Sequence, residues 1–235
     1  EFLYYVSEDT LFRTSTATTV TPTVGWTRME GVDASIDGNI FSLASTRGPY
    51  TEKNHLFIGT ANGKVYRLKD PQVTAATSAP VDITPTGMSP GSVVSDISVN
   101  PRNQDTVMVV AANYNINSIF WTGNATSSSP TWQVVEGNLT LPSVRSCEVV
   151  AKTTGVEYYV GTTSGLFSTA TINNSSTVWS REVGGPMSTA IVNSLAYRWQ
   201  DNTLVVGTHG NGMFAAYIGN AVTLPTGVNT PIRND

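Results

Sequence analysis

A short motif that recurs along the chain limits its fold more than any other feature of the sequence. The segment Leu56–Tyr66 reads LFIGTANGKVY, and it returns as YYVGTTSGLF from Tyr158 and as LVVGTHGNGMF from Leu204. Looser copies begin at Phe2 and Val107. The positions that we take as equivalent to Gly59 are Tyr5, Gly59, Ala111, Gly161 and Gly207, at spacings of 54, 52, 50 and 46 residues. Repeats of this period are typical of β-propeller blades.

The copies also share their neighbours in the sequence. Four of them follow a short apolar run, at Ile40–Ala44, Val93–Val99, Val144–Val150 and Ile191–Tyr197. Three of them precede a Trp that has a Gly five residues later, at Trp26, Trp132 and Trp179. Each unit is therefore predicted to contain an innermost strand A, a strand B that ends near the Gly-Thr, a strand C and a Trp-led strand D. Counted this way, the chain has three strands in the first unit, four in each of the next three, and three in the last.

These units predict an all-β chain, a β-propeller of four-stranded antiparallel blades with about five blade units. The propeller covers residues 1–218, and residues 219–235 are expected to form a linker-like tail. The blade units are placed at about 1–33, 34–88, 89–139, 140–187 and 188–218. Both a complete five-bladed ring and part of a larger propeller, with additional blades or domains upstream and downstream, remain open.

The composition excludes several partners. A net charge of -4 with only 13 Lys and Arg residues provides no basic surface for nucleic acid. No stretch approaches the roughly 18 apolar residues that cross a bilayer, so no membrane insertion is expected. The single cysteine, Cys147, is expected to be a small buried hydrophobic residue. The many Thr and Asn residues favour an extracellular or cell-surface location.

The strings YYVGTTSGLFST, TVWSREVGG and LVVGTHGNGMF resemble the Asp-box (BNR) and sortilin-like group of β-propellers. More narrowly, they resemble secreted Bacteroidetes propellers that the type IX system exports, and the resemblance covers the chain except for the tail. The Asp box of that group reads Ser-x-Asp-x-Gly-x-Thr-Trp. The matching stretches here, 15–26, 121–132 and 168–179, keep the Trp and lose the Asp.

Because some members of that group are sialidases or other glycosidases, the resemblance also raises an enzymatic reading. Sialidases need an arginine triad, a Tyr nucleophile with a Glu partner, and a Phe/Tyr-Arg-Ile-Pro string, which is absent here. The weak catalytic candidates are Asp96 and Glu148. Aligning the strand A runs on Leu43, Ile97, Val149 and Leu195 places Ser42, Asp96, Glu148 and Ser194 at one position. The two carboxylates could then act as an acid pair or hold a cation, or each could bind neighbouring backbone.

The turns between strands B and C are the expected ligand-binding loops, because loops on a rigid scaffold carry most binding functions. Their candidate residues are Asp9, Asn62, Asn113, Tyr114, Asn115, His209 and Asn211. We expect a non-catalytic recognition or assembly module for a surface glycan or a protein partner. A glycoside hydrolase with part of its site outside this chain is the alternative. No cofactor or metal is expected, although a structural cation such as calcium stays open. Trp26, Trp132 and Trp179 are expected to be buried between blades.

Overall fold

The computed structural model describes residues 2–46, 54–139, 142–182 and 189–219, and the regular secondary structure of these residues is almost entirely β-strand. They form five antiparallel sheets of three or four strands, with one short helix, α1 (Glu30–Asp33). The number of strands in each sheet, in chain order, is three, four, four, four and three. The predicted fold class is confirmed, and so is the expected number of strands in each unit.

Each sheet is built from consecutive strands, and we call the sheets blades 1 to 5. Blade 1 contains β1 (Leu3–Ser7), β2 (Thr10–Thr14) and β3 (Thr27–Arg28). Blade 2 contains β4 (Ile40–Ser45), β5 (His55–Thr60), β6 (Val65–Lys69) and β7 (Val81–Asp82). Blade 3 contains β8 (Val94–Val99), β9 (Val107–Ala111), β10 (Ile119–Thr122) and β11 (Gln133–Val134).

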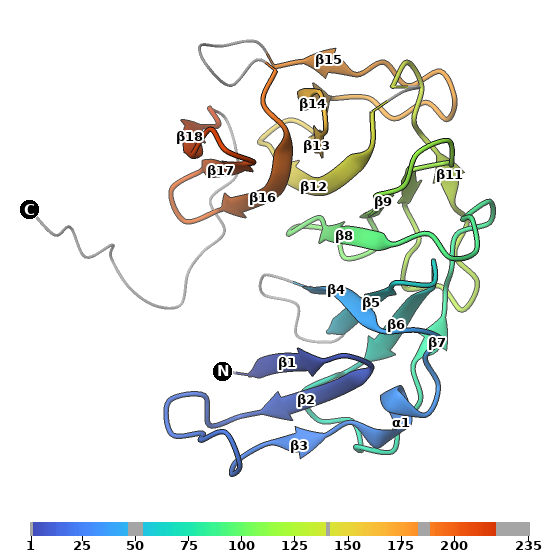
Figure 1. Ribbon diagram of the computed structural model, residues 1–235, viewed down its shortest axis with the longest axis vertical. Coiled ribbons are helices and arrows are strands. Elements are labelled where there is room, and N and C mark those ends of the chain that lie inside the picture. Colours follow the sequence, from blue (N-terminus) through green and yellow to red (C-terminus); the bar gives the residue numbers. More distant parts are fainter. Residues whose placement is uncertain (1, 47–53, 140–141, 183–188, 220–235) are drawn as a thin grey trace, which may run out of the picture.

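Blade 4 contains β12 (Val144–Ala151), β13 (Val156–Thr162), β14 (Gly165–Thr169) and β15 (Ser180–Arg181). Blade 5 contains β16 (Val192–Arg198), β17 (Thr203–Thr208) and β18 (Met213–Tyr217). The blades stand side by side in an open arc, with blade 1 at one end and blade 5 at the other (Figure 1). The strands β4, β8, β12 and β16 line the inner side of the arc and are each blade's strand A (Figure 1).

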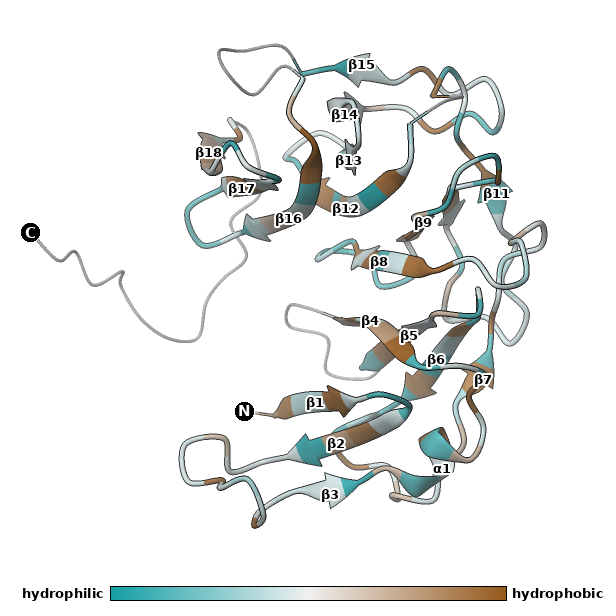
Figure 2. Ribbon diagram, viewed as in Figure 1, coloured by the Kyte–Doolittle hydropathy of each residue, from teal (hydrophilic) through white to brown (hydrophobic). Residues whose placement is uncertain are grey.

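The hydrophobic core is divided among the four interfaces between successive blades. One cluster, which includes Leu11, Val32 and Leu56, lies between blades 1 and 2, and a second, with Phe57 and Phe120, lies between blades 2 and 3. Two further clusters lie between blades 3 and 4 and between blades 4 and 5. Figure 2 shows hydrophobic residues along strands such as β4 and β8, and hydrophilic residues in many of the loops. Each blade thus buries its apolar faces against its neighbours.

Two of the three Gly residues that follow a repeat Trp by five positions, Gly31 and Gly137, have a packing reason, and the third, Gly184, lies outside the described residues. A Cβ at Gly137 would lie 1.6 Å from the carbonyl oxygen of Thr177 in blade 4. A Cβ at Gly31 would lie 2.3 Å from the carbonyl oxygen of Thr77 in blade 2. The loop before strand D of the next blade therefore rests on this position, and only glycine lets the two backbones approach so closely.

The three repeat tryptophans differ in their surroundings. Trp179 is 2% exposed, and its Nε1 donates to the Val135 carbonyl of blade 3 at 2.8 Å. Trp132 is half-buried and donates to the Ile83 carbonyl of blade 2 at 2.8 Å. Trp26 is only partly buried and donates to Thr21 in its own loop. Trp179 is therefore buried as predicted, whereas Trp132 and Trp26 are each partly buried. Trp26 differs from the other two in its partner, because no blade of the described chain precedes blade 1.

The predicted tail and the predicted unit boundaries stay predictions. Residues 220–235 of that tail lie outside the described residues.

Cys147 is buried as expected, and burial raises the pKa of its thiol. The described part of the chain contains no helix of the length and apolarity that a membrane crossing needs.

Candidate functional site

Strand pairing corrects the expected alignment of the inner strands. Ser42 lies opposite Gly59, Asp96 opposite Val110, and Ser146 opposite Gly161, each just after an irregularity in the ladder. Ser146 is therefore the equivalent of Asp96, and Glu148 lies two residues further along. The prediction that Asp96 and Glu148 share one position is wrong. The apolar run of β12 extends through Val149–Ala151, so its hydrophobic pattern alone does not fix the register.

Asp96 joins blade 3 to blade 4. Its carboxylate accepts a hydrogen bond from the backbone amide of Cys147 at 3.0 Å and another from the amide of Ile97 at 2.9 Å. The side chain is half-buried. A carboxylate that accepts backbone N–H bonds stabilises the contact between the two inner strands.

Glu148 performs the same task between blades 4 and 5. It is 7% exposed, and its Oε2 accepts from the amide of Tyr197 at 3.2 Å. Its Oε1 accepts from the Ser98 hydroxyl at 3.0 Å, and Ser98 Oγ accepts in turn from the amide of Val149 at 2.9 Å. Ser98 and Glu148 hold equivalent positions on β8 and β12, and each receives the equivalent amide of the next blade.

The channel wall therefore has a chemistry suited to holding blades together. A cavity of about 190 Å³ lies there, lined in part by Asp96, Ser98 and Glu148. Both carboxylates point their oxygens at backbone amides of the next blade. Among the described residues, no three His, Cys, Asp or Glu side chains gather as a metal site would require.

The B–C turns share one face of the arc. In blades 2 to 5 the turn donates a backbone hydrogen bond to the residue just before its own strand A, at Asn39, Val93, Ser143 and Ile191. Asp96 contacts Cys147, and two residues further along each strand Ser98 contacts Val149. The strands β8 and β12 therefore run parallel. Because the inner strands share this direction, their starting ends and the B–C turns beside them lie on the same rim, as expected.

The B–C turn of blade 3 lines a pocket on this rim. It encloses about 450 Å³ and is lined mainly by polar groups of Ser89, Asn113, Asn115, Asn117, Ser118 and Glu136. Tyr114 stands beside it, 61% exposed. Asn115 has φ +58°, a left-handed conformation that Asn tolerates better than most residues. The structure thus brings together Asn113, Tyr114 and Asn115, three of the seven predicted loop residues.

Two polar groups of this pocket have defined partners. Asn113 Oδ1 accepts from the amide of Val93 at 3.0 Å, which fixes the base of the turn. Glu136 Oε1 accepts from the amide of Ser118 at 2.9 Å. Burial raises the pKa of Glu136, and the hydrogen bond from Ser118 opposes that rise. Glu136 was missed from the sequence because it lies after strand D, far from the B–C motif, and no repeat landmark marks it.

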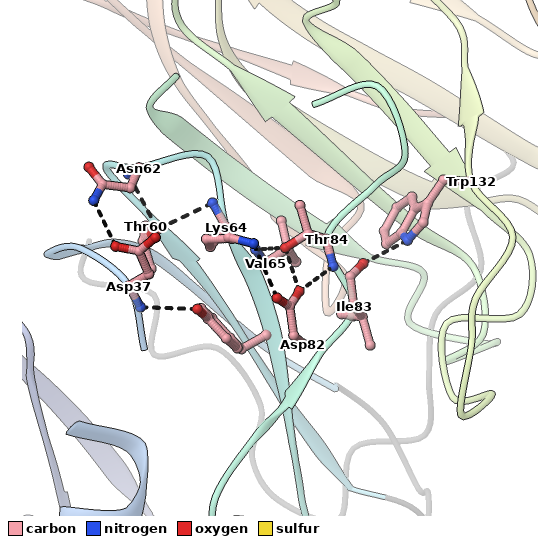
Figure 3. Close-up of polar contacts among 10 residues, drawn as sticks. Asp37, Thr60, Asn62, Lys64, Val65, Asp82, Ile83, Thr84 and Trp132 are labelled. Carbon is pink, nitrogen blue, oxygen red and sulfur yellow. Dashed lines mark hydrogen bonds and ion pairs between the residues drawn. The ribbon is translucent and has the colours of Figure 1, made fainter. Parts of the chain in front are cut away.

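Asn62 belongs to a different network, on blade 2 (Figure 3). Its side-chain amide donates to Asp37 at 3.0 Å, and its backbone amide donates to Thr60 Oγ1 at 3.3 Å. Nearby, Lys64 Nζ pairs with Asp82 at 3.3 Å. Although burial of Asp82 would raise its pKa, hydrogen bonds from Thr84 and Lys64 outweigh that effect and lower it. Asn62 therefore holds its own turn in shape.

The other predicted loop residues lie on the end blades. Asp9 accepts a hydrogen bond from the Thr10 hydroxyl at 3.1 Å in blade 1. His209 and Asn211 are exposed in the turn of blade 5, where the His209 amide donates to Ile191. The seven predicted residues thus occupy four separate turns, and two of them, Asn113 and Asn115, line the rim pocket of blade 3.

Comparison with known proteins agrees with the fold. No family model and no curated protein matches the chain. The β-propeller domain of Cps50 (Swd1) from Myceliophteria thermophila is similar, with a TM-score of 0.61 and 14% identity over 93% of this chain and 62% of that one. So is the extracellular domain of a B. thetaiotaomicron protein described as a hybrid two-component system, with a TM-score of 0.57 and 14% identity over 91% of this chain and 25% of that one.

The chain thus spans less than two thirds of the length of either solved structure. At 14% identity the similarity concerns the fold alone. Together with the five antiparallel sheets, it defines this chain as a β-propeller module.

Proposed function

We propose that this propeller module is a non-catalytic recognition domain that binds a surface glycan at the blade 3 rim pocket. The observation that carries the proposal is the pocket lined by Asn113, Asn115 and Asn117, in a turn that also carries the exposed Tyr114. Sugars offer many hydroxyl groups to amide and carboxylate partners, and they stack on aromatic rings. A concave site with a few convergent polar groups is suited to a small ligand.

The inner carboxylates support a non-catalytic role. Most glycosidases use two carboxyl groups that face the scissile bond, one of them free to protonate the leaving oxygen, whereas sialidases replace one with a Tyr nucleophile. Asp96 and Glu148 instead accept backbone amides of the neighbouring blades. The competing proposal, a propeller glycosidase related to sialidases with part of its site outside this chain, has no comparable support from these contacts.

An extracellular or cell-surface location is part of the proposal. The low charged content, 13%, and the Thr- and Asn-rich surface support it. The similar B. thetaiotaomicron structure is an extracellular domain, which is compatible with this location. Export by the type IX system and membership of the Asp-box or sortilin-like group belong to the same proposal, and they rest on the sequence motifs alone.

Binding to a glycan array tests the proposed function. Wild-type chain is compared with Tyr114→Ala and Asn115→Gly, and His209→Ala in the blade 5 turn is the matched control. Loss of binding in the two blade 3 variants, with binding retained in the control, supports the proposal. Binding that survives in all variants, or a chain that binds a protein and no glycan, contradicts it.

A further inference from the structure

The outer face of blade 1, against which no other blade of the described chain packs, carries three aromatic rings. The ring of Tyr5 lies 5.8 Å from that of Trp26 and 6.3 Å from that of Phe12, measured between centroids. These rings line a pocket of about 640 Å³ together with residues 20–23 and Arg28. Tyr5 is 55% exposed and Leu3 on the same strand is 45% exposed. An exposed apolar surface of this kind marks an interaction site.

Strand pairing shows that this face of blade 1 is equivalent to the face that packs against the preceding blade in blades 2 to 5. Tyr5 pairs with Phe12 just as Ile58 pairs with Tyr66, Val109 with Phe120, Val160 with Phe167 and Val206 with Phe214. An aromatic residue therefore occupies this strand C position in all five blades. In blades 2 to 5 the strand B partners are at most 2% exposed, because they pack against the preceding blade. Tyr5 has the same position and no such neighbour.

The tryptophan register leads to the same conclusion. In blades 1, 3 and 4, the residue three positions after the repeat Trp donates its backbone amide to a carbonyl of strand C. These donors are Met29, Val135 and Glu182. In blades 3 and 4 the indole N–H then reaches a backbone carbonyl beside strand D of the preceding blade, at Ile83 and Val135. Trp26 donates within its own loop instead. The missing element is a strand D segment that offers a carbonyl oxygen.

The opposite end of the arc has a complementary feature. Gly59 and Gly161 each contact the valine that begins the inner strand of the next blade. A Cβ at Gly59 would lie 2.4 Å from the Val94 side chain, and a Cβ at Gly161 would lie 2.5 Å from the Val192 side chain. At Gly207 in blade 5, the three atoms nearest to a Cβ would all belong to Ser194 of its own blade. On the same face, Met213 is 80% and Tyr217 is 71% exposed. This face has the form of a blade interface without the next blade.

We propose that each end face of the arc packs against a further, complete propeller blade. Before blade 1, that blade presents a strand D carbonyl to Trp26 and an apolar residue to Tyr5 and Phe12. After blade 5, it presents an inner strand whose first apolar side chain rests on Gly207. The partner is defined by continuation of an interface that already occurs four times in this chain.

A second copy of the chain does not meet these requirements. Within the described residues, blade 5 has no strand D to offer Trp26, and blade 1 has no inner strand to offer Gly207. Head-to-tail packing would therefore leave both contacts unmade. The inference does not depend on the glycan site, because the two end faces and the blade 3 rim are separate surfaces.

Hydroxyl-radical footprinting of the protein isolated from the cells that produce it tests the inference, with the purified 235-residue chain as reference. We expect Tyr5, Trp26 and Met213 to be oxidised readily in the 235-residue chain and to lose that reactivity in the isolated protein. Tyr114, 61% exposed on the rim, is the control that stays reactive, and Tyr158, 6% exposed, is the protected control. Sedimentation velocity of the 235-residue chain and of Trp26→Ala is run in parallel.

Each outcome of these experiments either supports or overturns the inference. Protection of all three side chains in the isolated protein, with a monomeric 235-residue chain, supports the inference. Equal oxidation of Tyr5, Trp26 and Tyr114 in the isolated protein overturns it. Concentration-dependent association of the 235-residue chain that Trp26→Ala abolishes assigns the face to a second copy. Protection of Trp26 in the 235-residue chain by an added glycan assigns the pocket to a ligand, and both of these results also overturn the inference.

Discussion

The Ser98 hydroxyl donates a hydrogen bond to Glu148 Oε1 at 3.0 Å, across the interface between blades 3 and 4. The two residues hold the same position in their own inner strands, and each accepts the equivalent backbone amide of the next blade, from Val149 and from Tyr197. A hydroxyl and a carboxylate thus fulfil one structural role in successive blades. This equivalence separates the account from an enzymatic one, in which Glu148 would be paired with Asp96.

The first prediction concerns the acceptor at Glu148. Glu148→Ala leaves the buried amide of Tyr197 and the Ser98 hydroxyl without their partner, so the free energy of unfolding should fall by about 1.5–3 kcal/mol. Glu148→Gln keeps an acceptor oxygen and should lose clearly less. Urea unfolding of both variants measures the difference. Equal losses in the two variants would show that the hydrogen bonds contribute nothing.

The second prediction concerns acid stability. His55 is 3% exposed, and burial, with a smaller contribution from Arg67, lowers its pKa to about 4. Since the unfolded state binds the proton near pH 6.5, the unfolded chain holds more protons between pH 6.5 and 4, and stability falls as the pH drops through this window. The loss contributed by His55 should be up to about 3 kcal/mol.

Unfolding free energies of wild-type chain and His55→Leu from pH 7 to pH 4 measure this effect. The variant should have a shallower slope than wild type. Identical slopes in His55→Leu and wild type would refute the assignment.

The third prediction compares two glycines of the same motif. In Gly161→Ala the new methyl group overlaps Val192 of the next blade and Ser146 of its own, which should cost about 1–3 kcal/mol. In Gly207→Ala the methyl group meets only the Ser194 side chain, which can rotate away. In the 235-residue chain Gly207→Ala should therefore be the milder variant. A thermal melt in which Gly207→Ala is the more damaging change would contradict the packing described for blade 5.

The fourth prediction compares two tryptophans. Trp179 is 2% exposed in the core between blades 3 and 4, and its truncation to Ala should cost about 3–5 kcal/mol. Trp26 at the uncovered end should cost much less in the 235-residue chain. Denaturant midpoints of Trp179→Ala and Trp26→Ala provide the comparison. Similar losses would mean that Trp26 stabilises blade 1 by itself.

The sequence allowed the fold to be predicted because the period, the Gly-Thr motif and the apolar runs are local features that repeat. Register was harder to predict. We took Ala111 as equivalent to Gly59, whereas pairing with Asp96 identifies Val110, and a similar shift placed Glu148 where Ser146 lies. Apolar runs of unequal length do not specify which residue faces which neighbour.

The candidate site was predicted only in part. The Asn113–Asn115 turn was found because Asn and Tyr in a turn signal polar recognition, and that turn does line a pocket. Glu136 joins the same pocket from a segment after strand D, a contact that only the packed blade creates. That Trp26 donates within its own loop was also unpredictable from its own residues, since the partner of this indole depends on a neighbouring blade.

Asp96 and Glu148 accept backbone amides of the next blade, and we propose that they take no part in catalysis. The most direct test measures the release of reducing sugar from a glycan panel by the protein isolated from its producing cells. The Asp96→Asn and Glu148→Gln variants, each first shown to be folded, are assayed in the same way. The account predicts no turnover in any of them, with glycan binding unchanged in both variants. Turnover by the wild-type protein that either substitution abolishes, while the fold stays intact, would contradict it.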